Sequence, residues 1–312
     1  MMPHRGQSRV HSGGSLGIRA RRGATSDAKP EGPLFDLTAE PTMQRSQGRA
    51  RVAFAVAGGV TRLAELQQSG SGKAMLPRVA GPVPEVVFLN TSGGLTGGDR
   101  LDFAVEVAAG GRVSATTQTA ERAYASTGGM AEVRVRATVG AGGRLDWLPQ
   151  EAILYEASRL DRRTEIDLAG DATCLMSEAV VLGRHAMGEE PRDATLQDRR
   201  VIRRDGRPVW AESLMLDAQA LRRQSSPALL GGARAMAVLA LVARGAEDAL
   251  AALRAVLDEP GCTAAATGWD GRLLLRVLAR DGWPLRRQMA RAIRVLSGRP
   301  LPRVWQMQGE NG

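Results

Sequence analysis

The sequence of 312 residues predicts a mainly β protein, in which a stacked β-hairpin or β-helix-like body is followed by a small C-terminal α/β unit. Two observations predict this fold. From residue 47 to about residue 218, short runs of alternating apolar and polar residues are separated by glycines, as strands and tight turns are. After that point, two segments change to the period of an amphipathic helix.

The body begins with separate alternating runs and continues with a faint internal repeat. Period-two runs occur at 51–57, 60–66, 85–90, 101–107 and 132–139. Three stretches then share one pattern, a strand, a tight turn with a glycine, and a second strand; these glycines are Gly110, Gly142 and Gly170. Similar units that stack would cover each other's apolar faces, as in a β-helix. An ordinary β-meander would give the same pattern, so both arrangements remain open.

If the repeats stack in the spacing of their turns, three polar residues fall in one column: Gln118, Gln150 and Glu178. Glu178 stands in the apolar run "CLMSEAVVLG", and Glu212 stands in a similar run, "PVWAESLML". A carboxylate in such surroundings needs an ionic partner, water in an internal channel or a bound cation, because burying it alone is costly.

The C-terminal unit is predicted as β-α-β-β-α. A strand in "ARAMAVLALV" precedes a helix at 246–257, a short strand near 262–267, a strand at 271–279 and a helix at 284–296. We expect the closing segment "PLPRVWQM" to pack on the body through Trp305. The domain boundaries predicted from these patterns are 1–46, 47–218 and 219–312.

The charge is uneven along the chain. The formal net charge is +9, and five arginines within residues 1–26, which hold no acidic residue, leave +4 for the rest. Residues 1–26 resemble a transit peptide in composition, and a disordered basic leader over residues 1–46, or an upstream start codon, is the simpler interpretation. The longest apolar run, 235–243, is too short to cross a bilayer. Cys174 and Cys262 form no close-spaced motif, so we expect a cytoplasmic protein without a membrane partner.

The loop "NTSGGLTGGDRL" has the glycine spacing of a phosphate-binding loop but not its chemistry. Asp99 stands where such a loop has lysine, and an alternating strand follows where a helix is required. Among the histidines only His185 lies in the body, beside Glu189 and Glu190, and a surface histidine is the simpler interpretation. We therefore expect no enzyme activity. Carboxylates hold divalent metals loosely, which suits metal transfer or docking better than storage.

Five blocks in series resemble the UreD (UreH) family of urease accessory proteins, over roughly residues 49–305. The blocks are "LNTSGGLTGGDRLDF", "TTQTAERAYAS", "LDWLPQEAILYEASRLDRRTEIDL", "EAVVLGRHAMGE" and "LPRVW". One departure is Arg122, where the family often has lysine. The resemblance implies a mostly β, helix-like stack. It also implies a non-enzymatic chaperone that joins UreF and the GTPase UreG, docks on apo-urease and conducts nickel through an internal tunnel, with no tightly bound cofactor.

Carried over by motif, the resemblance implies that Asp99, Glu178 and Glu212 are acidic tunnel positions for nickel in transit. Gln150 and Glu151, in the L-P-Q-E block, are weaker candidates, and Gln118 is a possible polar neighbour. Replacing Glu178 with Leu or Asp99 with Ala should then leave a folded, complexed protein that loads less nickel into urease.

Two alternatives remain open. The acids could simply pair with buried arginines such as Arg100 or Arg184. A basic nucleic-acid-binding module would also explain the charge, but aromatic residues for base stacking are scarce and the charge is concentrated in the leader. Trimming residues 1–46 and measuring nucleic-acid binding would test that alternative; we expect no nucleic-acid partner.

Overall fold

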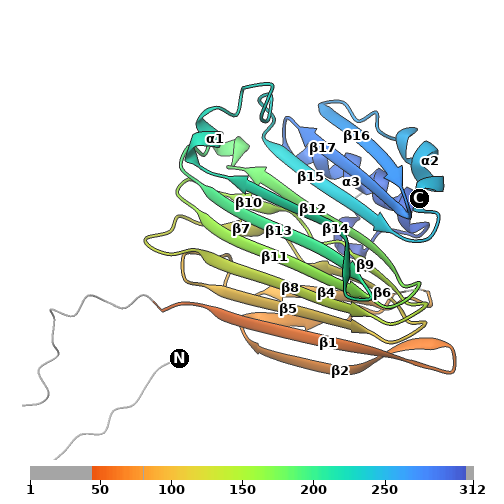
Figure 1. Cartoon of the computed structure of the whole chain (residues 1–312). Coiled ribbons are helices and arrows are strands. Elements are labelled where there is room, and N and C mark those ends of the chain that lie inside the picture. Colours follow the sequence, from red (N-terminus) through yellow and green to blue (C-terminus); the bar gives the residue numbers. More distant parts are fainter. Residues whose placement is uncertain (1–43, 80, 307–312) are drawn as a thin grey trace, which may run out of the picture. The chain divides into compact units, whose positions relative to one another are not determined.

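The computed structural model describes residues 44–79 and 81–306, which are built mainly from strands (Figure 1). In this part of the chain the strands form sheet A, with seven strands, and sheet B, with ten. The strands of sheet A are β1 (Gln47–Ala57), β2 (Val60–Gly70), β5 (Arg100–Val107), β8 (Ala131–Val139), β11 (Arg159–Leu168), β13 (Thr195–Arg204) and β14 (Arg207–Leu216). Their order across the sheet is β14-β13-β11-β8-β5-β1-β2.

Sheet B has the order β16-β17-β15-β12-β9-β6-β4-β3, with β7 and β10 paired beside β12. Its strands are β3 (Gly72–Met75), β4 (Glu85–Asn90), β6 (Arg112–Thr117), β7 (Glu121–Ala123), β9 (Arg144–Trp147), β10 (Ala152–Leu154), β12 (Thr173–Leu182), β15 (Ala235–Val242), β16 (Cys262–Trp269) and β17 (Arg272–Ala279). The helical elements are α1 (Ala218–Arg222), η1 (His185–Met187), η2 (Ala246–Ala249), α2 (Leu250–Arg254), α3 (Gly282–Ser297) and η3 (Arg303–Trp305). None of these described helices is long and apolar enough to span a membrane.

The stacked body predicted from the repeat is confirmed. Each unit runs from sheet A to sheet B, as β5–β6, β8–β9 and β11–β12, and pairs in parallel with the next unit (Figure 1). The two strands of a unit therefore lie in different sheets and do not pair as a hairpin, so the meander alternative is wrong. Gly110, Gly142 and Gly170 turn the chain with φ of +67°, +67° and +53°, a region that favours glycine.

The predicted column of Gln118, Gln150 and Glu178 is wrong, because the register between the last two units differs by one residue. Arg144 pairs with Thr173 rather than with the residue before it. A shift of one residue moves a strand's side chains to the opposite face of the sheet. Accordingly, Gln150 accepts a hydrogen bond from α3 on the outer face of sheet B, whereas Glu178 is paired with β11 of sheet A.

The main core lies between the two sheets. Leu101, Phe103 and Val105 alternate with half-buried residues along β5, as a strand with one covered face requires. Phe103 and Trp147 stack around Phe88, with ring centroids 4.7 Å and 5.9 Å from it. Burying side chains of this size contributes about 1.5–3 kcal/mol each, so this core is a large part of the stability of the body.

A second core lies on the outer face of sheet B, under α2, α3 and the C-terminal segment. The predicted order β-α-β-β-α is found, although the helix expected at 246–257 is two short pieces, η2 and α2. The strands β15, β17 and β16 extend sheet B rather than forming a sheet of their own. All eight residues of β15 are buried, because sheet A and α3 lie on its opposite faces. The domain boundaries stay a prediction, and residues 1–43 of the expected leader lie outside the described residues.

Candidate functional site

A chain of charged side chains crosses the interior between the two sheets, and we call it the interior ion network. Its members alternate in sign and come from four strands: Glu178, Arg162, Asp198, Arg200 and Glu212. The network joins two of the acids that the sequence singled out. The three residues that connect these two acids, Arg162, Asp198 and Arg200, were not predicted as site residues.

The alternation of side chains along the strands of sheet A directs the connecting residues of the network into the interior. Along β11, Arg162 occupies a buried position in the same alternation as Leu160 and Ile166. Along β13, Asp198 and Arg200 do the same. Period-two alternation therefore carried a signal for these residues, since it puts charges where apolar residues are expected. The register then sets Arg162 opposite Asp198 in the neighbouring strand.

Glu178 stands at one end of the network and is 2% exposed. Its Oε1 accepts a hydrogen bond of 2.7 Å from the hydroxyl of Thr164, and its Oε2 lies 2.6 Å from Arg162 Nη1. The same guanidinium reaches Asp198 through Nε at 3.2 Å and Nη2 at 2.5 Å. One arginine thus neutralises two carboxylates that would be very costly to bury alone.

Asp198 and Arg200 continue the network toward the surface. Burial would raise the pKa of Asp198, but the guanidiniums of Arg162 and Arg200 outweigh it and hold that pKa below its usual range. Arg200 also donates to Glu212 Oε1 at 3.1 Å. Arg276 of β17 contacts the other oxygen of Glu212, so sheet B closes the network at this end.

The network ends at an open cavity of about 390 Å³. Glu178, Arg200, Glu212 and Arg276 supply its charged lining, and apolar residues of β14 to β17 supply most of the rest. A cation that entered this cavity would meet Glu212 first, which is more exposed than Glu178. The arrangement offers carboxylates at successive depths, each of them shared with a guanidinium.

Glu178 and Glu212 pair with arginines, as one alternative proposed, but not with the two arginines named in it, and the partners of Asp99 are backbone N–H groups. Arg100 lies 3.6 Å from Glu132, and Arg184 lies 2.7 Å from Glu189. Within residues 44–79 and 81–306, no group of three or more His, Cys, Asp or Glu side chains is arranged to hold a metal ion. The interior ion network is therefore a series of single carboxylates.

Asp99 is buried in the loop between β4 and β5, where both of its oxygens accept backbone hydrogen bonds. Oδ1 accepts from Ser46 N at 2.7 Å, and Oδ2 accepts from Thr96 N at 2.8 Å. Gly94, with φ of +152°, leaves room for the ring of Tyr124, which a Cβ would overlap at 2.3 Å. The glycines thus permit a tight turn, and Asp99 ties that turn to β1.

We expect Asp99→Ala to lower the free energy of unfolding by about 1–3 kcal/mol, because two partly buried N–H groups lose their acceptor. Urea unfolding of the purified protein measures this change. The control is Asp102→Ala in β5, whose carboxylate only faces Arg136 at 3.6 Å near the surface. That control should change stability by less than about 1 kcal/mol. Equal effects of the two changes would show that Asp99 does not hold the loop.

The remaining predicted positions lie apart from the interior ion network. Arg286 of α3 contacts Gln150 and lies 3.6 Å from Glu151 on the outer face of sheet B. Gln118 lines a small cavity of about 70 Å³ beside the loop. His185 is exposed, and the neighbouring acids are paired with arginines.

Glu121 lines the same small cavity as Gln118. Its place in the block "TTQTAERAYAS" was the one signal in the sequence that could have marked this residue. Asn90 Nδ2 donates to its Oε1 at 3.2 Å. Burial raises the pKa of Glu121 to about 7, which leaves this carboxyl group partly protonated at neutral pH.

Comparison with known proteins agrees with the resemblance seen in the sequence. Residues 46–306 match the family described as UreD urease accessory protein. A protein of Cereibacter sphaeroides named urease accessory protein UreD is 63% identical over 264 residues, which are 85% of this chain and 96% of that protein. Proteins of the same name from Paracoccus denitrificans and Methylobacterium are 55% and 43% identical, covering 88% and 85% of this chain and 98% and 96% of their own. This chain therefore belongs to the UreD family of urease accessory proteins.

Proposed function

We propose that this chain is a non-enzymatic chaperone for the nickel centre of urease. It would act in a complex with UreF and UreG, dock on apo-urease in the cytoplasm, and conduct nickel while UreG hydrolyses GTP. Membership of the UreD family supports the urease accessory role. The interior ion network supports a path for a cation, and it is the observation that carries this part of the proposal.

Nickel is the cargo in this proposal and not a resident cofactor. A cation in the cavity would replace a guanidinium at Glu212 and then at Glu178, while the displaced arginine kept its second carboxylate. The described network contains no imidazole or thiolate, and oxygen ligands hold nickel more weakly than nitrogen or sulfur ligands do. Weak, successive sites favour release, as transfer requires. Asp99 remains a proposed transit position, although its oxygens are already shared with backbone N–H groups.

Glu178→Gln and Glu212→Gln test this path. Both changes keep a side-chain oxygen and remove the charge that would bind a cation. We expect each to lower the nickel content of co-expressed urease several-fold, as measured by metal analysis of the purified enzyme. Glu165→Gln is the matched control, because Glu165 faces Arg203 on the outer surface of sheet A at 3.3 Å.

Two further measurements accompany the nickel analysis. Co-purification with UreF-like and urease subunits must be unchanged, and the melting temperature of the chain must be followed in each variant. Normal nickel content in both network variants would contradict the path. A loss in Glu165→Gln as large as theirs would contradict it as well, since that carboxylate lies outside the interior.

A further inference from the structure

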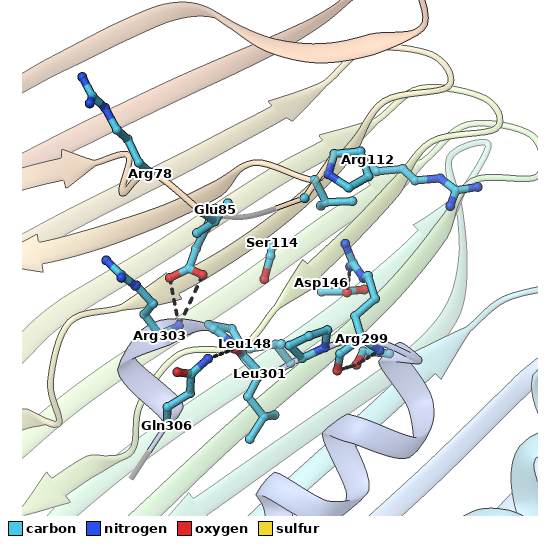
Figure 2. A pocket seen from close by; sticks show the side chains of 17 residues that line it. Arg78, Glu85, Arg112, Ser114, Asp146, Leu148, Arg299, Leu301, Arg303 and Gln306 are labelled. Atoms are coloured by element: carbon cyan, nitrogen blue, oxygen red, sulfur yellow. Dashed lines mark hydrogen bonds and ion pairs between the residues drawn. The ribbon is translucent and has the colours of Figure 1, made fainter. Parts of the chain in front are cut away.

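A cavity of about 670 Å³ lies on the outer face of sheet B, away from the interior ion network (Figure 2). Its floor is one row of side chains across three parallel strands. Glu85 of β4 pairs with Ser114 of β6, which pairs with Asp146 of β9. Residues 78–79 and 81–83, before β4, form one wall, and residues 299–303 and 306, after α3, form the other.

The floor presents hydrogen-bond acceptors. Asp146 is 1% exposed and already neutralised by Arg144, at 2.8 Å, and by Arg299. Glu85 is 6% exposed, and within the described part of the chain its oxygens accept only the backbone N–H of Arg303, at 3.3 Å each. A ligand that lies on Glu85 and on the hydroxyl of Ser114 is therefore favoured if it brings N–H donors.

The rim is positively charged. Arg78, Arg112 and Arg303 line the cavity and are exposed. None of them lies within ion-pair distance of a carboxylate of residues 44–79 or 81–306, although the charge of Arg303 acts on Glu85. Figure 2 shows Arg78 and Arg303 on one side of the cavity and Arg112 on the other. The three guanidiniums do not converge on one point. They suit several separated negative charges better than a single phosphate group.

We propose that this cavity binds an acidic peptide segment of a partner protein. Backbone N–H groups of the peptide would face the floor, and its Asp or Glu side chains would reach the arginines on the rim. Three prolines of the walls, Pro82, Pro300 and Pro302, offer a surface for an extended chain. A nucleotide fits less well, because no aromatic side chain among the lining residues could stack on a base. The volume is within the usual range for ligand sites, about 300–1,000 Å³.

The test uses the full chain and a fluorescein-labelled peptide of alternating Glu and Ala, with binding followed by fluorescence anisotropy. The variant combines Arg78→Gln, Arg112→Gln and Arg303→Gln. The control combines Arg207→Gln, Arg222→Gln and Arg223→Gln, which removes equal charge from exposed arginines that form no ion pair in the described part of the chain. The loss of three surface charge contacts should weaken peptide binding about tenfold, and we expect this weakening in the first triple variant but not in the control.

Each other outcome would overturn the proposal. Equal weakening in both triple variants would mean attraction by net charge alone. Displacement of the peptide by tripolyphosphate or ATP at the concentration that unlabelled peptide requires would assign the cavity to phosphate groups. Absence of binding by the unaltered chain would exclude the site. Far-UV circular dichroism of both variants shows whether the fold is retained.

Discussion

Arg162→Met is expected to lower the free energy of unfolding by about 3–5 kcal/mol, because it leaves two buried carboxylates without their shared cation. Glu178 and Asp198 are 2% and 0% exposed, so water cannot replace the guanidinium. Methionine keeps most of the aliphatic volume of the arginine side chain. The loss of stability therefore reports on the missing charge rather than on a new cavity. Urea unfolding at pH 7 measures the effect.

The loss in free energy of unfolding caused by Arg162→Met should depend on pH. In the unaltered chain the pKa of Asp198 is below its usual range, so its stabilising contribution is present above the unfolded-state pKa and is lost as the pH falls through the folded-state pKa. In the variant, Asp198 keeps only Arg200 of its two guanidiniums, so its folded-state pKa lies closer to the unfolded-state value and less stability remains to be lost in acid. The difference between the two proteins should therefore shrink as the pH falls below the unfolded-state pKa of about 4.

Arg203→Met is the matched control for this prediction. Arg203 also faces two acids, Glu165 at 3.3 Å and Asp167 at 3.7 Å, but on the solvent side of sheet A. Exposed pairs of this kind contribute up to about 1 kcal/mol. A loss in Arg162→Met no larger than in this control, or one that does not change with pH, would contradict the view of the network as a buried charge chain.

Trp305→Ala is expected to destabilise the protein by about 3–5 kcal/mol, as removal of a buried aromatic side chain does. Trp305 is 3% exposed, and its Nε1 donates to the carbonyl of Leu148 at 2.8 Å. The guanidinium of Arg286 in α3 lies 5.0 Å from the ring centroid. One residue thus joins the C-terminal segment to both sheet B and α3. Thermal or urea unfolding would show the loss.

Trp283→Ala provides the comparison within the same region. Trp283 begins α3 and is 54% exposed, and alanine is a good helix former, so we expect a change of less than about 1 kcal/mol. Similar effects of the two substitutions would show that the C-terminal segment does not contribute to the second core. Trp305→Phe should give an intermediate loss, because it keeps much of the packing and removes the hydrogen bond.

Much of the fold could be predicted because its causes are local. Alternation of apolar residues marked β5 and β8, and Gly110 and Gly142 marked turns that do adopt left-handed φ. The period of α3 was visible as well, and Asp281 and Gly298 cap it at its ends. What the repeat did not show is that the two strands of a unit belong to different sheets. Which strands pair with each other depends on contacts between residues distant in the sequence, and local periodicity carries no information about those contacts.

Part of the candidate site could likewise be predicted from the sequence, and part of it could not. The apolar runs around Glu178 and Glu212 show without a structure that both carboxylates need compensation, and the sequence blocks mark the UreD family. The partners that compensate the two carboxylates follow from the pairing of strands that are distant in the chain. The register of β11, β13 and β14 brings Arg162, Asp198 and Arg200 between the two acids. A difference of one residue between units placed Gln150 on the opposite face from Glu178, because strand side chains alternate with a period of two.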